Sequence, residues 1–188
     1  MSQQELLITV VRELDAVKVP YMLTGSIASS LHGEPRATHD VDLVIAVQPK
    51  VVAHLASVFC EPEYYLDPQS AESAMQSGQM FNLIQVTSGD KVDFWPLTDD
   101  PFDTARFNRR EPVEVAGVWV YVSSPEDTIL IKLRWAKQSG GSEKQFGDAL
   151  RVYEVQAGGL DLVYIGQWVD RLGLQDYWGR LIRESEPL

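Results

Sequence analysis

Cysteine is the residue that this sequence uses least, since Cys60 is the only one among 188 residues. A single cysteine excludes an intramolecular disulfide framework and any metal site built from several thiolates. We therefore expect Cys60 to be a small, buried, hydrophobic side chain. Histidine is nearly as scarce, and the three histidines are too scattered to predict a ligand set.

Long apolar runs are also lacking. No window approaches the roughly 20 consecutive apolar residues that a membrane helix requires. Charged residues such as Glu5, Arg12 and Glu13 interrupt the N-terminal segment, where a secretory signal would need an unbroken apolar core. We expect a globular cytoplasmic protein without a membrane partner, because 45% of the residues are hydrophobic and aromatic residues are well represented.

Positive charge is in deficit: 16 Lys and Arg residues stand against 27 Asp and Glu residues, a net charge of −11. This balance opposes loose binding to nucleic acid. The one basic cluster, formed by Arg106, Arg109 and Arg110, lies in a proline-flanked segment (98–112) that we predict to be an exposed loop. A tRNA partner would depend on whether that loop borders the active site.

Residues 1–122 alternate between helical and strand patterns. Helices are expected at 3–17, 27–31 and 49–59, and strands at 21–24 and 40–47. Two later segments, 81–97 and 113–122, have turn residues at their centres and predict β-hairpins. Between these patterns, residues 61–79 are polar and predict irregular structure.

The pattern becomes helical from Ser124 onward. Ser124 as a cap, Pro125 at the first helical position and Asp127 three residues after the cap form a strong helix start. Gly140-Gly141 and Gly158-Gly159 interrupt this pattern, and three further helical segments are expected at 142–156, 161–172 and 174–183. We therefore expect a core at 1–122 and a helical region at 123–188.

Two aspartates stand on an otherwise apolar strand. Side chains two apart on a strand project from one face, so Asp40 and Asp42 present both carboxylates to one point, with Cα atoms about 6.6 Å apart. Their repulsion and desolvation require a compensating cation. Hard oxygen ligands of this kind suit Mg²⁺, which proteins typically hold through one or two carboxylates and the phosphates of a substrate.

A third carboxylate, Asp93, lies between Val92 and Phe94 on the second strand of the first predicted hairpin. A two-metal site needs a bridging carboxylate and outer ones around ions roughly 3.5 to 4 Å apart. We predict that Asp93 is either the third metal ligand or the base that takes a proton from the acceptor.

Gly25 and Ser26 follow the strand at 21–24 and open a helix. Glycine permits close backbone approach, and a helix N-terminus offers unpaired N–H groups to a phosphate. Taken alone, such a turn is usually only a turn. Arg36, shortly before the aspartates, is placed to pair either with a phosphate or with the carboxylates themselves.

These features occur together in one order: Leu23, Gly25 and Ser26, then thirteen residues, then Asp40-Val41-Asp42-Leu43, then Val92-Asp93-Phe94. As a set they resemble the DNA polymerase beta-like nucleotidyltransferase superfamily. The resemblance implies an α/β fold in which a mixed, mostly antiparallel sheet is backed by helices. It also implies that the C-terminal helical region forms the other wall of the active-site cleft.

The activity that this resemblance implies is transfer of a nucleoside monophosphate from an NTP bound to Mg²⁺ or Mn²⁺. The acceptor would be a hydroxyl of a small molecule, a protein or a tRNA. In that arrangement Asp40, Asp42 and Asp93 are the catalytic residues and metal ligands. Gly25 and Ser26 would bind the nucleotide.

The segments PRATHDVDLVI (35–45) and SPEDTILIKL (124–133) look like the AbiEii-type and minimal nucleotidyltransferase (MNT-like) branch, which includes toxins of toxin–antitoxin systems. An antitoxin protein is therefore one expected partner. Lys132 and Asp148 occupy places similar to a Lys and an Asp of that branch, although Phe146-Gly147 stand where a basic residue usually precedes the Asp. Lys132 would reach the triphosphate, or else it is a snorkelling side chain at a helix edge.

A catalytically inactive nucleotidyltransferase-like protein, serving as a binding or regulatory partner, is the alternative from another functional class. The three carboxylates favour the enzyme, because an inactive site has no reason to keep like charges on apolar strands.

Overall fold

The computed structural model describes residues 2–48 and 50–186. They separate into two units, and the chain passes from one to the other more than once. The first unit takes Met1–Thr24 and Thr38–Val122, and the second takes Gly25–Ala37 and Ser123–Leu188. A short N-terminal segment thus groups with the C-terminal helices. Within the described residues, no helix has the length and apolar character needed to cross a membrane.

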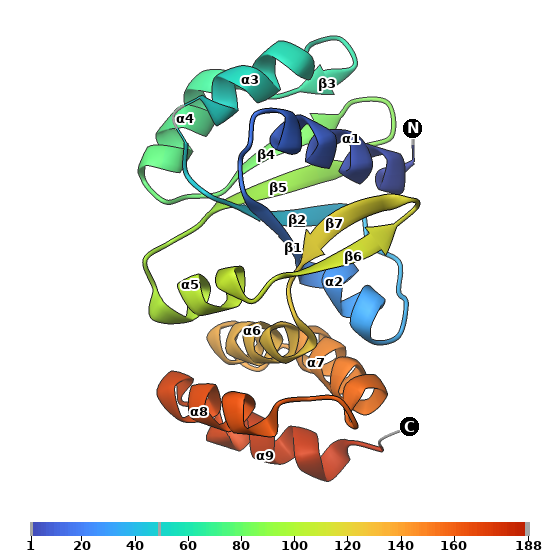
Figure 1. The fold of residues 1–188 in the computed structure, drawn as a ribbon, viewed down its shortest axis with the longest axis vertical. Coiled ribbons are helices and arrows are strands. Elements are labelled where there is room, and N and C mark those ends of the chain that lie inside the picture. Colours follow the sequence, from blue (N-terminus) through green and yellow to red (C-terminus); the bar gives the residue numbers. More distant parts are fainter. Residues whose placement is uncertain (1, 49, 187–188) are drawn as a thin grey trace. The chain divides into compact units, whose positions relative to one another are not determined.

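The first unit is built on one sheet with the strand order β3-β4-β5-β2-β1-β7-β6 (Figure 1). Its strands are β1 (Tyr21–Thr24), β2 (Asp40–Ile45), β3 (Tyr64–Tyr65), β4 (Phe81–Gln85), β5 (Lys91–Pro96), β6 (Glu111–Val115) and β7 (Val118–Val122). The β1–β7 and β2–β5 pairs are parallel and the other neighbours are antiparallel. The predicted mixed, mostly antiparallel sheet is confirmed, as are both hairpins.

Four helices of this unit are described: α1 (Gln3–Ala16), α3 (Val51–Val58), α4 (Pro68–Gln76) and α5 (Pro101–Asn108). The amphipathic pattern that predicted the first helix is confirmed. Ser2 begins α1 with a capping box, and one apolar stripe of the helix is buried. The stripe consists of Leu6, Leu7, Val10, Val11 and Leu14. The predicted start of the next helix at Pro49 lies outside the described residues.

Alternation along β2 and β5 separates an apolar face from a polar one. Val41, Leu43, Val92 and Phe94 are fully buried. The residues between them are the aspartates and their neighbours, which therefore project from the opposite face. Burial of the apolar face fixes the register, because a slip of one residue would bring the aspartates into the core.

The second unit contains only helices among its described elements: α2 (Gly25–His32), α6 (Pro125–Gln138), α7 (Glu143–Gln156), α8 (Leu162–Leu172) and α9 (Gln175–Glu184). The predicted helix start at Ser124 is confirmed, since its side chain accepts a hydrogen bond from the Asp127 backbone. The glycine breaks also divide this region as predicted. Helix α2 lies beside α7 and α6 (Figure 1).

Three predictions for the first unit are wrong. The segment 98–112 is not a loop, because Asp100 caps α5 and Pro101 occupies its first turn. Residues 61–79 are not wholly irregular, because Asp67 and Pro68 start α4 in the same way. Cys60 is exposed rather than buried, since it follows the end of α3.

Gly33, directly after α2, approaches the α7 backbone so closely that a Cβ atom there would lie 2.9 Å from the Val152 nitrogen. We expect Gly33→Ala to lower the free energy of unfolding by about 1–3 kcal/mol, because two backbones must move apart. Gly166→Ala in α8 is the matched control, since nothing lies within 4 Å of the added methyl group. In urea denaturation, the free energy of unfolding of Gly166→Ala should be equal to or slightly higher than that of the native protein. Equal effects of the two substitutions would contradict the close packing.

Candidate active site

The three predicted carboxylates lie on one face of two neighbouring strands in the first unit. Asp42 on β2 is the register partner of Asp93 on β5, and Asp40 is the partner of Lys91. Partner residues on adjacent strands project to the same side of a sheet. The fold therefore brings Asp93 beside Asp40 and Asp42, from which it is about 50 residues away in sequence.

Lys91 connects two of these carboxylates. Its Nζ lies 2.8 Å from Asp93 Oδ2 and 3.3 Å from Asp40 Oδ1. The hydrogen bond to Asp93 is the main influence on the lysine, and together with the charges of Asp93 and Asp40 it outweighs desolvation and raises the pKa of Lys91. The sequence analysis assigned no role to this lysine. Its spacing of two from Asp93 was the available signal, because that spacing places both side chains on one face.

Asp93 is the most deeply placed of the three aspartates and is only 5% exposed. Its Oδ2 accepts the Lys91 hydrogen bond, whereas its Oδ1 is buried and has no hydrogen-bond partner. A buried carboxylate oxygen without a partner is costly and marks a position for a cation or a proton. Asp93 therefore has a carboxylate oxygen available to bind a metal ion or to accept a proton, the two roles predicted for it.

Trp95 continues the same alternation on β5. Its indole Nε1 donates a hydrogen bond of 3.3 Å to Asp42 Oδ1, and its ring is 42% exposed. Trp95 is therefore not a core side chain. An exposed ring beside the Asp42 carboxylate is a surface on which a base or sugar can stack.

The donor set fits a divalent cation in kind, because three carboxylates share one face and one of them has a buried, unpartnered oxygen. As the side chains stand, no group of three or more His, Cys, Asp or Glu residues in the described ranges is arranged to hold a metal ion. Lys91 accounts for part of this arrangement, since its ammonium group draws Asp40 and Asp93 toward itself.

Two arginines of the predicted basic cluster make contacts within the first unit. Arg106 is 5% exposed, forms a 2.9 Å ion pair with Asp103 and donates to Thr24, the register partner of Asp42. The Arg110 guanidinium lies over the Phe107 ring, 4.3 Å from its centroid. The prediction of a solvated basic loop is therefore wrong, because these side chains pack against their own helix and sheet.

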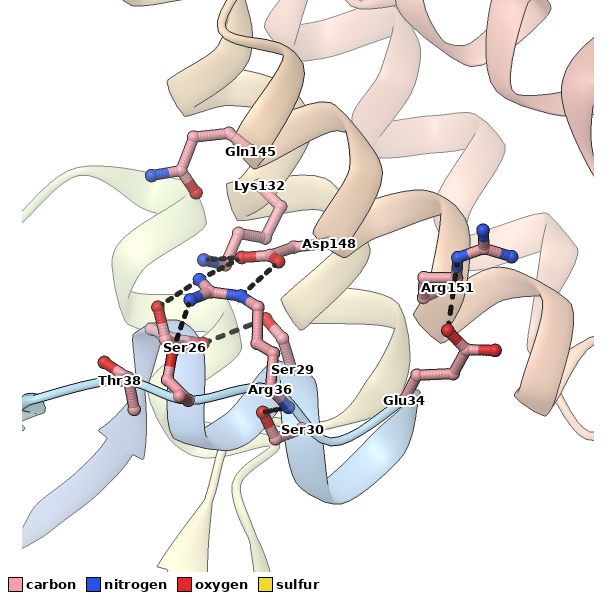
Figure 2. Close-up of polar contacts among 12 residues, drawn as sticks. Ser26, Ser29, Ser30, Glu34, Arg36, Thr38, Lys132, Gln145, Asp148 and Arg151 are labelled. Atoms are coloured by element: carbon pink, nitrogen blue, oxygen red, sulfur yellow. Dashed lines mark hydrogen bonds and ion pairs between the residues drawn. The ribbon is translucent and has the colours of Figure 1, made fainter.

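The second unit contains a separate polar cluster (Figure 2). Gly25 opens α2 with φ 68°, a conformation that favours glycine, and Ser26 follows it. Arg36 donates to the Ser26 hydroxyl and, through two nitrogens, to both oxygens of Asp148 at 2.7 and 2.8 Å. This two-pronged pairing fixes the guanidinium plane as well as its position.

Lys132 on α6 completes this cluster from within the helices. Its Nζ lies 2.7 Å from Asp148 Oδ2, and the side chain is only 1% exposed. The interpretation of Lys132 as a snorkelling side chain is therefore wrong. Burial acts to raise the pKa of Asp148, but hydrogen bonds from Arg36 and Lys132 outweigh it, so the net pKa is lowered.

Arg36 and Asp148 also line a pocket of about 290 Å³ within this unit, together with Lys144 and Arg151. Arg36 and Asp148 are therefore accessible from the cavity, whereas Lys132 does not line it and contacts Asp148 from the buried side. The sequence analysis left the role of Asp148 open. The signal it lacked is the packing of α7 against α6 and α2, which no local pattern reveals.

No family model matches the chain, and neither does any curated protein. Among solved structures, the fold is similar to an antigenic nucleotidyltransferase-like protein from Paracoccidioides brasiliensis. That match has 16% sequence identity and a TM-score of 0.59 and covers 99% of this chain and 94% of the other. It is also similar to ANT(2")-Ia in complex with adenylyl-2"-tobramycin, with 16% identity and a TM-score of 0.54 over 96% of this chain and 99% of that one. At such identities the similarity establishes the fold, and the chain therefore has the fold of nucleotidyltransferase-like proteins.

Proposed function

We propose that the protein is a metal-dependent nucleotidyltransferase, which moves a nucleoside monophosphate from an NTP to an acceptor hydroxyl and releases pyrophosphate. The observation that carries the proposal is the register of β2 with β5, which places Asp40, Asp42 and Asp93 on one face. Three carboxylates on that face, in a fold used by nucleotidyltransferases, are the donors that Mg²⁺ or Mn²⁺ prefers.

Asp40 and Asp42 would hold the cation and Asp93 would be the third ligand or the base. Bound Mg²⁺ would lower the pKa of the acceptor hydroxyl and neutralise charge that develops on the phosphate. Asp93 is suited to receive the acceptor proton because its Oδ1 has no other partner. Trp95 would present its exposed ring to the base or to a sugar of the acceptor.

Gly25, Ser26, Arg36 and Lys132 are the proposed nucleotide-binding residues. Arg36 is the best candidate for direct phosphate contact, because its guanidinium is a permanent cation in the lining of a pocket, where a phosphate would share it with Asp148. Lys132 is buried against Asp148, so we assign it an indirect part in which it holds the partner of Arg36 in place. The backbone N–H groups at the start of α2 would add to anion binding.

Fewer observations bear on the class of acceptor than on the nucleotidyl transfer itself. ANT(2")-Ia was solved with an adenylylated aminoglycoside, which supports a small hydroxylated molecule as one acceptor class for this chain. The resemblance to the AbiEii-type branch supports a toxin–antitoxin component, with an antitoxin as partner and a tRNA or protein as acceptor. The engagement of Arg106 and Arg110 within the first unit makes tRNA the weaker choice.

The test is the thermal stability of the native protein with Mg²⁺, with each of the four NTPs, and with both together, followed by an assay for NTP consumption. A cation that binds only the folded protein should raise the melting temperature, and Mg²⁺ with the correct NTP should raise it further. Stabilisation without consumption under any acceptor tried would favour the inactive, binding-protein alternative. No stabilisation by any combination would contradict both.

A further inference from the structure

Lys91 stands where a cation shared between the two strands would be expected. A single ammonium group contacts Asp93 at 2.8 Å and Asp40 at 3.3 Å, and so joins carboxylates of β5 and β2. The lysine extends from the same face of β5 as Asp93, two residues earlier. Lys91 thus places a positive charge between the buried carboxylate of Asp93 and the half-exposed carboxylate of Asp40.

The same lysine conflicts with a divalent cation. A metal ion held by Asp40, Asp42 and Asp93 would share two of these carboxylates with Lys91, and its charge would lie only a few ångströms from the ammonium group. Like charges at such distances weaken binding by a factor on the order of a hundred or more, even with the screening of a protein surface. Lys91 and a divalent cation are therefore two competing ways to neutralise the carboxylates.

We propose that Lys91 is an internal counter-ion that competes with the divalent cation for Asp40 and Asp93 and moves aside when the cation binds. This inference rests on the proposed function. Its consequence is that the cation binds weakly by itself and binds well when NTP phosphates supply further ligands. Lys91 is thus a positioning residue that makes metal binding depend on the nucleotide.

The stem of Lys91 makes the exchange feasible. The side chain is 34% exposed, so the ammonium group has a path to solvent, unlike the buried Lys132. A lysine ammonium is a compact charge on a flexible stem, whereas an arginine at this position would be fixed by its fork. Asp93 Oδ1 remains without a partner while Lys91 holds Oδ2, so the cation has one oxygen to bind before the lysine leaves.

The test is the Mn²⁺ affinity of the nucleotide-free protein, measured in a titration in which electron paramagnetic resonance reports the concentration of free Mn²⁺. Lys91→Met should bind Mn²⁺ at least about tenfold more tightly than the native protein, because the competing charge is gone. Lys91→Gln, which keeps a hydrogen-bond donor for Asp93, should do the same and replaces the methionine variant if that one fails to fold. NTP should improve Mn²⁺ binding less in these variants than in the native protein.

Lys50→Met is the matched control. Lys50 is an exposed lysine of the same unit at the start of α3, with no side-chain capping bond, so its loss removes an equal charge away from the carboxylates. Its Mn²⁺ affinity should stay within about twofold of the native value. If native protein binds Mn²⁺ and the Lys91 variants bind it equally or more weakly, the competition is refuted while the metal site stands. If neither native nor Lys91 variants bind Mn²⁺ with or without NTP, the proposed function and this inference both fail.

Discussion

Asp42→Asn is expected to lower Mg²⁺-dependent NTP consumption by about a thousandfold, the scale of losing a preorganised charged group at a reacting phosphate. The amide keeps the shape of the carboxylate and retains an oxygen for the Trp95 hydrogen bond, so the fold should be unaffected. The loss would arise from the missing negative charge, since a neutral amide is a poorer ligand for a hard cation. The measurement is the initial rate of NTP consumption with Mg²⁺ at saturating nucleotide.

The control for this substitution is Asp99→Asn, which makes the same chemical change at an exposed position of the same unit. Its rate should match that of the native protein. Urea denaturation of Asp42→Asn should establish that the variant is folded under the conditions of the assay. A variant that is stable, folded and fully active would remove Asp42 from the site and with it the proposed role of the β2–β5 register.

Asp148→Asn is expected to cost about 3–5 kcal/mol of unfolding free energy, the largest stability effect that the structure predicts. The substitution leaves the buried Lys132 ammonium and the Arg36 guanidinium without their shared counter-ion. Adding Lys132→Met should recover part of the loss, because it removes a buried charge that has lost its Asp148 counter-ion. Asp176→Asn, at an exposed position of α9, should stay within about 1 kcal/mol of the native protein in the same urea titrations.

The same carboxylate predicts how stability depends on pH. Pairing lowers the folded-state pKa of Asp148 below its ordinary value of 3.8, so the unfolded chain takes up the proton first. Its stabilisation is therefore complete at neutral pH and declines as the pH falls below 3.8 toward the folded-state pKa. The difference between native and Asp148→Asn proteins should shrink over that acidic range. A constant difference down to the lowest pH studied would contradict the ion-pair assignment.

Alternation and capping signals carried most of what the sequence predicts about this fold. Val41 and Leu43 alternate with the aspartates, and that period of two was enough to place Asp40 and Asp42 on one face. Helix α5 was not predicted, although its start carries the usual sequence signals. Its cap and proline, Asp100 and Pro101, are the same signals that identified the helix at Ser124, but arginines and flanking prolines favoured a loop.

The parts of the site that could not be predicted depend on contacts between distant segments. The sequence shows that Lys91 and Asp93 share a face, but it does not show that β5 lies parallel to β2 with Lys91 opposite Asp40. Asp148 was in doubt for the same reason. Its importance comes from Arg36, which is 112 residues away in the chain.

The grouping of residues 25–37 with the C-terminal helices has a consequence for how this protein is made and altered. Helix α2 has its packing partners α6 and α7 roughly a hundred residues downstream, so during synthesis it emerges long before these two helices. The helical unit therefore cannot be exchanged as one continuous segment of the chain. A chimera that exchanged only the segment after Val122 would separate Arg36 from its native partner Asp148. A successful exchange must therefore also include residues 25–37.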